Sequence, residues 1–358
     1  MRRYRPNEHD STSRLTFGYA FVADDALEAL EHGILAEKCG FDRVWSPDHL
    51  VDVDGDKAEP WSVLSAIAAR TKKVELASSV TDTQRCHPAR TAHSVACLDA
   101  ISHGRAILGI GAGEAMNIVP YGIGWERPRE RCLRLAEAIQ IIRLLWTSSR
   151  EEPVNFTGTF YNLEKAFLSQ RPAQKPYPPI YVGAIASKRA LQLVGKYADG
   201  WHAWLNTPET FKKRWSIIKE AAESAGRSPK RIKATSHIMV AFPRSRSENK
   251  AALLAGKAHL LVEKNMLREL GYDTQLEQYQ NLDVSKESIV RIMKAAEQVP
   301  EDAVYRVLAI RGSDDIEERV EELSKAGVTH FVIGDLMAPK TVNRTLKLFR
   351  AIIRRYSG

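Results

Sequence analysis

The chain has 358 residues, 44% of them hydrophobic, and a formal net charge of +8, which suits one large α/β barrel or two ordinary domains. Its basic residues are scattered and form no stripe with interleaved aromatics, so we expect no nucleic-acid partner. No apolar run approaches the length that spans a membrane. The basic surface is either simply solvated or attracts an anionic cofactor or substrate.

The four cysteines form no CxxC pair. Cys39, Cys97 and Cys132 lie inside helical patterns, where a small apolar core residue is expected, and this usage predicts a reduced, cytoplasmic compartment. Residues 1–13 are polar and basic without an apolar segment, so we expect a flexible tail and no signal peptide. The remainder, residues 14–358, is predicted to be one domain.

Apolar segments of strand length alternate with segments of helical periodicity along the chain. This alternation predicts parallel strands joined by right-handed crossovers. Eight strands favour a (β/α)₈ barrel over a doubly wound sheet, the competing arrangement. The expected strands are Leu15–Ala23, Asp42–Ser46, Lys73–Val80, the apolar start of Ala106–Asn117, Pro179–Ala184, Asp199–Trp204, Arg231–Phe242 and Thr329–Gly334. The expected helices are Asp24–Cys39, Trp61–Thr71, Ala89–Ile101, Pro128–Trp146, Ser187–Ala198, Pro208–Ala225, Ile316–Ala326 and Thr341–Tyr356.

Two segments interrupt the alternation. Val154–Leu163 has the pattern of a hairpin inserted before the fifth barrel strand. Pro243–Tyr305, after the seventh strand, is long, charged and largely helical. This second segment is either an inserted lid over the strand ends or a small domain. We expect residues 243–305 to cover the pocket and to select the substrate.

The stretch Ala106–Asn117, AILGIGAGEAMN, begins as a strand buried on both faces would. Gly109, Gly111 and Gly113 let its backbone pass close to something flat or bulky. The run is not the dinucleotide fingerprint, because Glu114 stands where the third glycine belongs. A carboxylate at the exit of a buried barrel strand has the placement of a catalytic residue.

Polar groups also gather at the other predicted strand ends, where barrel enzymes carry their function. Taken singly, each has a structural explanation: Asp48 can cap a turn, and His49 can be a hydrogen-bonded core imidazole. Because five predicted strand ends each carry such polar groups, we interpret the groups together as an active site. The groups are Asp48 and His49, Ser79 and Thr81, Glu114 and Asn117, Ser187 and Lys188, and His202.

Gly183–Lys188 opens a helix after the fifth strand. Its free backbone N–H groups, with Ser187 and Lys188, suit a phosphate, although an ordinary N-cap at Ser187 explains the same residues. The sequence holds no HExxH motif or Cys/His cluster, so no metal site is expected. It also lacks the GxSxG elbow of a serine nucleophile.

Several segments, in this order, resemble the bacterial-luciferase-like superfamily, and more narrowly its branch that uses the deazaflavin coenzyme F420. That branch includes secondary alcohol dehydrogenases, glucose-6-phosphate dehydrogenases and methylenetetrahydromethanopterin reductases. The resemblance covers residues 14–205 well and residues 304–356 more loosely. The segments are GFDRVWSPDHL, SSVTDTQRCHPA, GRAILGIGAGEAMN, FTGTFYNLEKAFL and PIYVGA.

The resemblance implies a role for each candidate residue and a homodimer formed through helices near the second and third strands. Asp48 would hydrogen-bond the deazaflavin ring, and a bulge with a non-prolyl cis peptide between Ser79 and Val80 would support the ring from behind. His49 and Glu114 would be the acid/base pair over the reactive carbon. The other cofactor-facing positions would be Thr81 and Asn117 and, along the phosphate-bearing tail, Gly183, Ala184, Ile185 and Lys188.

The sequence departs from the branch at several positions. The dehydrogenases carry a tryptophan shortly after the Asp-His pair, where Asp52 and Val53 stand here. The reductase's glutamate on the first strand corresponds to Ala20, with Asp24 nearby, and its glutamine after the fifth strand to Ile185. Of the basic residues in the sugar-phosphate enzyme's insertion, Arg306 can match one, whereas Lys294 and the others do not align securely.

The prediction is therefore an F420-dependent oxidoreductase that moves a hydride between the deazaflavin and a small polar substrate of the alcohol/ketone, sugar-phosphate or methylene-pterin type. Hydride exchange by the coenzyme leaves a proton for the protein to handle, and a His and a Glu with separated pKa values can do so. One alternative is an FMN-dependent monooxygenase of the same superfamily. A second is a non-catalytic ligand-binding barrel.

Overall fold

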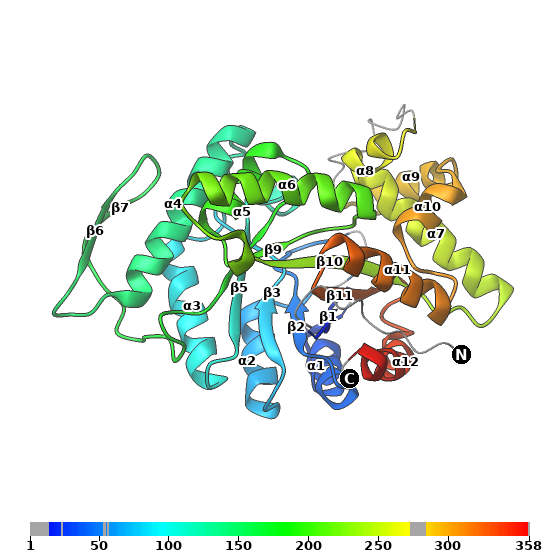
Figure 1. The fold of residues 1–358 in the computed structure, drawn as a ribbon, viewed down its shortest axis with the longest axis horizontal. Coiled ribbons are helices and arrows are strands. Elements are labelled where there is room, and N and C mark those ends of the chain that lie inside the picture. Colours follow the sequence, from blue (N-terminus) through cyan, green and yellow to red (C-terminus); the bar gives the residue numbers. More distant parts are fainter. Residues whose placement is uncertain (1–13, 23, 53–54, 56, 273–283, 357–358) are drawn as a thin grey trace.

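The computed structural model describes residues 14–22, 24–52, 55, 57–272 and 284–356, and eight parallel strands of this part close into a barrel (Figure 1). The barrel order is β3-β2-β1-β11-β10-β9-β8-β5, and pairing of β3 with β5 completes the circle. Closure confirms the predicted (β/α)₈ barrel and excludes the doubly wound sheet. The strands are β1 (Thr16–Ala20), β2 (Arg43–Ser46), β3 (Glu75–Ser78), β5 (Ala106–Gly111), β8 (Ile180–Gly183), β9 (Gly200–His202), β10 (Lys233–Val240) and β11 (His330–Asp335).

Helices surround the barrel, and their ends follow local capping chemistry. The Asp25 carboxylate accepts hydrogen bonds from the backbone N–H groups of Leu27 (2.8 Å) and Glu28 (2.9 Å) at the start of the first helix, which ends at Gly40 with φ +94°. The predicted tail, residues 1–13, lies outside the described residues. The surrounding helices are α1 (Ala26–Cys39), α2 (Pro60–Arg70), α3 (Pro88–Ile101), α4 (Pro128–Thr147), α5 (Lys188–Tyr197), α6 (Pro208–Ser224), α11 (Ser313–Ala326) and α12 (Val342–Tyr356).

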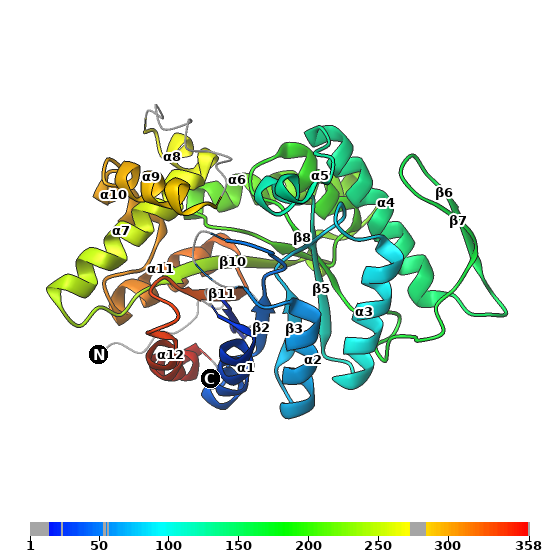
Figure 2. The same ribbon diagram turned by 180° about the vertical axis from the view of Figure 1, so that it is seen from behind.

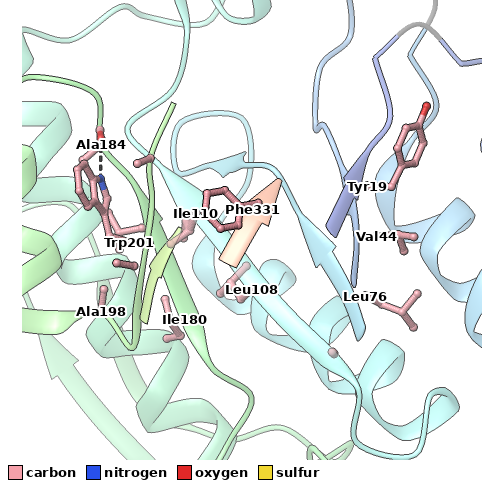
Figure 3. Packing of buried hydrophobic residues seen from close by; sticks show 14 of the residues in the cluster. Tyr19, Val44, Leu76, Leu108, Ile110, Ile180, Ala184, Ala198, Trp201 and Phe331 are labelled. Atoms are coloured by element: carbon pink, nitrogen blue, oxygen red, sulfur yellow. Dashed lines mark hydrogen bonds between the residues drawn. The ribbon is translucent and has the colours of Figure 1, made fainter. Parts of the chain in front are cut away.

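Side chains alternate between the two faces of each barrel strand, as the period of two requires. A small cluster fills the barrel interior and includes Trp45, Ala77 and Ile107. Their chain neighbours Val44 and Leu76 belong instead to the large core under the outer helices (Figure 3). The strands thus read as continuous apolar runs because both of their faces are buried.

The predicted hairpin is confirmed as β6 (Val154–Thr157) and β7 (Asn162–Ala166), which pair antiparallel and project beyond α4 (Figures 1 and 2). It extends three residues past the predicted end at Leu163. In both views, the helices between β10 and α11 lie on the opposite side of the barrel from this hairpin. These helices are α7 (Arg246–Val262), α8 (Lys264–Glu269), α9 (Lys286–Ala296) and α10 (Glu301–Val307).

The helices after β10 have their own hydrophobic cluster, which includes Leu260 and Ile292 together with barrel residues such as Met239. α7 and α10 approach closely at Gly256, where a Cβ atom would lie 2.8 Å from Cγ1 of Val304. The predicted helical insertion after the seventh barrel strand is therefore confirmed, and it packs onto the barrel.

Cys39 and Cys132 are buried in the large core, as their helical positions predicted, whereas the prediction was wrong for Cys97, which is half-buried and lies outside that core. All four cysteines are free thiols. None of the helices in the described part of the chain is both long and apolar enough to cross a bilayer.

Candidate active site

His49 and Glu114 meet at the carboxyl-terminal end of the barrel. His49 follows β2 and Glu114 follows β5, and Nε2 of the imidazole lies 3.5 Å from Oε2 of the carboxylate. The His49 side chain is 16% exposed and that of Glu114 is 54% exposed. The two residues assigned as the acid/base pair are thus neighbours, with the carboxylate on the solvent side.

The other ring nitrogen of His49 is held by Asp52. Nδ1 lies 2.8 Å from Oδ2 of Asp52, and the same oxygen lies 3.4 Å from Nζ of the buried Lys57. A carboxylate oxygen only accepts hydrogen bonds, so Nδ1 carries the proton and Nε2 is left to accept one. Asp52, at a position where the resemblance showed a departure, therefore orients the imidazole.

The two acidic neighbours set the proton affinity of His49. Burial lowers its pKa, but the charge of Glu114 and the hydrogen bond and charge of Asp52 outweigh burial, and the pKa is raised above the ordinary value. Lys57 opposes this rise only in part. The imidazole is therefore suited both to take up a proton and to give one back near neutral pH.

Asp48 is fixed by an arginine that sequence reasoning missed. Its Oδ1 lies 3.1 Å from Nη2 of Arg85, and the same guanidinium group donates to the Asp48 carbonyl oxygen. Arg85 is held in turn by the carboxylate of Asp82 in the short strand β4 (Thr81–Asp82). A cationic partner thus orients the side chain that the resemblance assigns to the deazaflavin ring.

Asn117 lies on the same rim, in the 3₁₀ turn η1 (Ala115–Asn117). Its Oδ1 accepts hydrogen bonds from the backbone N–H groups of Leu50 (2.6 Å) and Val51 (3.0 Å), which anchors the loop after His49. The side chain is 2% exposed, and its Nδ2 has no hydrogen-bond partner among the described residues. A buried donor without a partner is costly, so this atom fits a ligand acceptor.

The Ser79–Val80 peptide bond is cis, as predicted. Val80 packs into the space left by two glycines: a Cβ atom on Gly111 or Gly183 would lie 2.8 Å or 3.0 Å from its Cγ2. At Gly109 a Cβ atom would lie 1.9 Å from the Ser78 carbonyl oxygen. The bulky group that these glycines accommodate is therefore the protein's own segment after β3.

Two histidines inside the barrel extend from this bulge and were not connected by sequence reasoning. Nε2 of His202 lies 2.9 Å from Oγ of Ser79 and 2.9 Å from Nε2 of His237, which is on β10. Burial and the charge of Arg43 lower the pKa of His202 to about 3, and burial lowers that of His237 well below the ordinary value. Both rings are therefore neutral and position Ser79.

A second carboxylate approaches Glu114 from the insertion. Glu263 follows α7, is half-buried and is close enough to Glu114 for the two charges to repel. Burial and the Glu114 charge raise the pKa of Glu263 to about 7, opposed in part by Arg214 and the Trp204 indole. The pairing was hidden in the sequence because 263 lies in a charged helical stretch, where an acidic residue is unremarkable.

The segment after β8 has the local structure of a helix start. Oγ of Ser187 accepts from the N–H of Ala190 (3.4 Å), and Lys188 is exposed as the first residue of α5. The Ala184 carbonyl accepts from the Trp201 indole N–H (2.8 Å), as Figure 3 shows. Ile185 is half-buried. The N-cap explanation of Ser187 thus holds, and the phosphate role of this segment stays a prediction.

Asp24, the acidic residue near the first strand, interacts with residues other than His49 and Glu114. Its buried carboxylate contacts the His32 imidazole and accepts from the N–H of Val22 (3.1 Å). Ala20 lies in the interior cluster of the barrel. The first strand therefore contributes no carboxylate to the pair formed by His49 and Glu114.

A family model described as luciferase-like monooxygenase matches residues 6–330. The chain belongs to this family. The luciferase-like family uses the (β/α)₈ barrel seen here, and the resemblance stated from the sequence segments is confirmed.

Three similar proteins indicate the branch of the family to which the chain belongs. The 5,10-methylenetetrahydromethanopterin reductase of Archaeoglobus fulgidus is 30% identical over 334 residues, which cover 91% of this chain and 95% of the reductase. The F420-dependent glucose-6-phosphate dehydrogenase of Microbacterium testaceum is 37% identical over 241 residues, covering 64% of this chain and 69% of that enzyme. The structure of an F420-dependent secondary alcohol dehydrogenase with an F420-acetone adduct has a TM-score of 0.80 and 26% identity, covering 96% of this chain and 99% of the other. Within the luciferase-like family, the chain therefore groups with the F420-dependent branch.

Proposed function

We propose that this protein is a coenzyme F420-dependent oxidoreductase that transfers a hydride between the deazaflavin and a small alcohol/ketone, sugar-phosphate or methylene-pterin type substrate. The observation that carries the proposal is the contact between His49 and Glu114 on the rim that also holds Ser79 and Val80. The relatives named above, two of which are F420-dependent by name, support it.

The residues on the rim fit a planar, hydrogen-bonding cofactor. In the proposal, Asp48, Thr81 and Asn117 bind the ring system and the Ser79–Val80 segment supports it from behind; the buried Nδ2 of Asn117, which has no partner among the described residues, favours this. The phosphate-bearing tail lies along Gly183, Ala184, Ile185 and Lys188. When bound, F420 supplies the hydride acceptor or donor.

His49 manages the proton that accompanies the hydride. In alcohol oxidation, Nε2 takes the hydroxyl proton while the carbon-bound hydrogen leaves as hydride, and a carbonyl group results. In the reverse direction, the imidazolium gives this proton to the carbonyl oxygen. Asp52 holds the ring in the tautomer that this step needs, and the carboxylate of Glu114, at 3.5 Å, stabilises the protonated ring.

A titration of the purified protein with coenzyme F420 tests this function directly. Purified protein should quench or shift the fluorescence of F420 at micromolar concentrations, and the reduced coenzyme should be consumed with a member of a panel of ketones, imines and pterins. No binding at these concentrations would end the proposal. Yellow protein that consumes oxygen with reduced FMN supports the monooxygenase instead. No turnover with any member of the panel, and His49→Ala and Glu114→Ala variants that differ from the wild type in stability alone, support a non-catalytic barrel.

The proposal extends to the arrangement of the whole protein. Residues 243–305 act as the lid that selects the substrate, and the protein works as a homodimer through helices near β2 and β3. Replacing the insertion should change the substrate range and preserve coenzyme affinity. Sedimentation velocity measures the dimer, and a monomer at all concentrations contradicts that part.

A further inference from the structure

An apolar pocket lies between the insertion and the barrel. It has a volume of about 180 Å³, and its walls come from α7, α9 and the segments that follow β1 and β11. The wall residues are almost all aliphatic, and His259 is the polar exception among them. They are Val22, Ala255, Ala258, His259, Ile289, Ile292, Met293, Leu336 and Ala338.

Two routes of direct contact place this pocket beside the candidate active site. Along α7, the His259 ring lies 6.5 Å from the ring of Trp204, and Glu263, one helical turn further, interacts with both Trp204 and Glu114. A helix rises about 1.5 Å per residue, so Ala258 lies within about 8 Å of Glu263 along the axis. The pocket therefore lies near the rim that carries Glu114.

The second route runs along the barrel rim. Val22, in the pocket wall, donates its N–H to the carboxylate of Asp24 (3.1 Å), and Asp24 forms a parallel bridge with Lys57. Lys57 pairs with Asp52, which holds His49. The pocket and the acid/base pair thus share one end of the barrel.

The lining decides which part of a substrate suits this pocket. A phosphate group needs cationic or N–H donors. The two basic residues compared with those in the sugar-phosphate enzyme's insertion are exposed and lie outside the lining of this pocket. Arg306 donates to the Leu270 carbonyl oxygen (3.2 Å), and Lys294 faces solvent. An aliphatic wall favours hydrocarbon. A cavity of about 150 Å³ lined by aliphatic side chains accepts benzene, so 180 Å³ has room for about six carbon atoms.

We propose that this pocket holds the apolar end of the substrate, and that the substrate is a ketone or secondary alcohol carrying an alkyl or aryl group of about six carbons. This inference rests on the proposed function. It selects the alcohol/ketone type among the three classes considered and argues against a sugar phosphate. The reacting carbon sits beside His49, and the hydrocarbon extends along α7.

The test uses methyl ketones from acetone to 2-decanone as probes and measures their dissociation constants on the full chain by ligand-observed NMR. Affinity should rise about fourfold for each added methylene group until the pocket is full, and then stay constant. Ala258→Phe fills the pocket and should remove the gain for the longer ketones. Ala251→Phe places the same ring on the exposed face of α7 and should leave the gain intact.

Ile289→Trp, on the opposite wall, serves as a second blocking variant if Ala258→Phe does not fold. The inference is overturned if the affinity does not depend on the length of the ketone, or if Ala258→Phe and Ala251→Phe lose the gain for longer ketones equally. Coenzyme binding is measured separately by fluorescence. If the protein binds long ketones in this pattern but does not bind F420, the proposed function is contradicted and the role of the pocket is supported. If it binds F420 but its affinity for ketones does not follow this pattern, only the role of the pocket is contradicted.

Discussion

His49 and Asp52 are joined by a hydrogen bond of 2.8 Å between Nδ1 and Oδ2, on the side of the ring away from Glu114. One imidazole thus lies between two carboxylates with different tasks. Both raise the pKa of the ring, Glu114 more than Asp52 by charge. The buried carboxylate of Asp52 also fixes the tautomer, and that of Glu114 lies on the solvent side.

The first prediction concerns this arrangement. Asp52→Asn should lower the pKa of His49, because it removes a negative charge that favours the imidazolium. In the direction of alcohol oxidation, which needs the unprotonated base, the rising limb of the pH–rate profile should move to lower pH. His49→Gln should lower kcat about 10²–10⁴-fold and abolish that limb. An unchanged profile in Asp52→Asn contradicts the orienting role.

Arg85 provides a second prediction. Its guanidinium group holds Asp48 and Asp82 at once, and a lysine cannot maintain this two-sided geometry. Arg85→Lys should therefore weaken F420 binding, which a fluorescence titration measures, by about tenfold, the loss expected from one charge-assisted hydrogen bond. The matched control is Arg90→Lys, an exposed position in α3. Equal affinity in the two variants would show that the pair of Asp48 and Arg85 has no part in cofactor binding.

The sequence predicted the fold and the gathering of polar side chains at one end of the barrel because both follow from local pattern. Period-two strands, helical periodicity and polar strand ends are visible along the chain, and strand ends of a barrel meet at one rim. The pairing of His49 with Glu114 came from the family resemblance, and the two side chains lie 3.5 Å apart in the structure. The contact of Ser79 with His202 could not be predicted, because it depends on the register of strands across the barrel. Arg85 and Glu263 stand in polar stretches where a paired charge looks like a solvated one.

The glycines of the fourth barrel strand illustrate the same limit. Their number indicated close packing, but only the structure identifies Val80 and the Ser78 carbonyl group as the neighbours. A pattern of glycines indicates that another group packs closely against the strand, but it does not indicate which part of the chain that group belongs to.

This packing gives a third prediction. Gly109→Ala places a methyl group 1.9 Å from the Ser78 carbonyl oxygen, so the backbone must move. The variant should lose about 1–3 kcal/mol of stability and bind F420 more weakly, because the segment after β3 shifts. Gly124→Ala, where no atom lies within 4 Å of the added methyl group, should change the unfolding free energy by less than about 0.5 kcal/mol. Urea denaturation compares them, and equal stabilities contradict the prediction.

The last prediction concerns Glu263, whose pKa is raised to about 7 from 4.5 by burial and by Glu114. The folded state binds this proton more tightly than the unfolded state. Stability from the neutral acid is therefore fully present below about pH 4.5 and is lost as the pH rises through about 7. Glu263→Gln keeps a neutral side chain at every pH. It should match the wild type at pH 4 and exceed it at pH 9 by on the order of 2 kcal/mol, a value reduced because the side chain is half-buried.

Urea denaturation at both pH values measures the difference, with Glu287→Gln, an exposed carboxyl group in α9, as the control that should not alter the pH dependence. A second substitution, Glu114→Gln, removes the charge that raises the pKa of Glu263 and should reduce the loss of stability at high pH. If Glu263→Gln and the wild type lose stability in parallel between pH 4 and pH 9, the two carboxylates do not interact and Glu263 faces solvent.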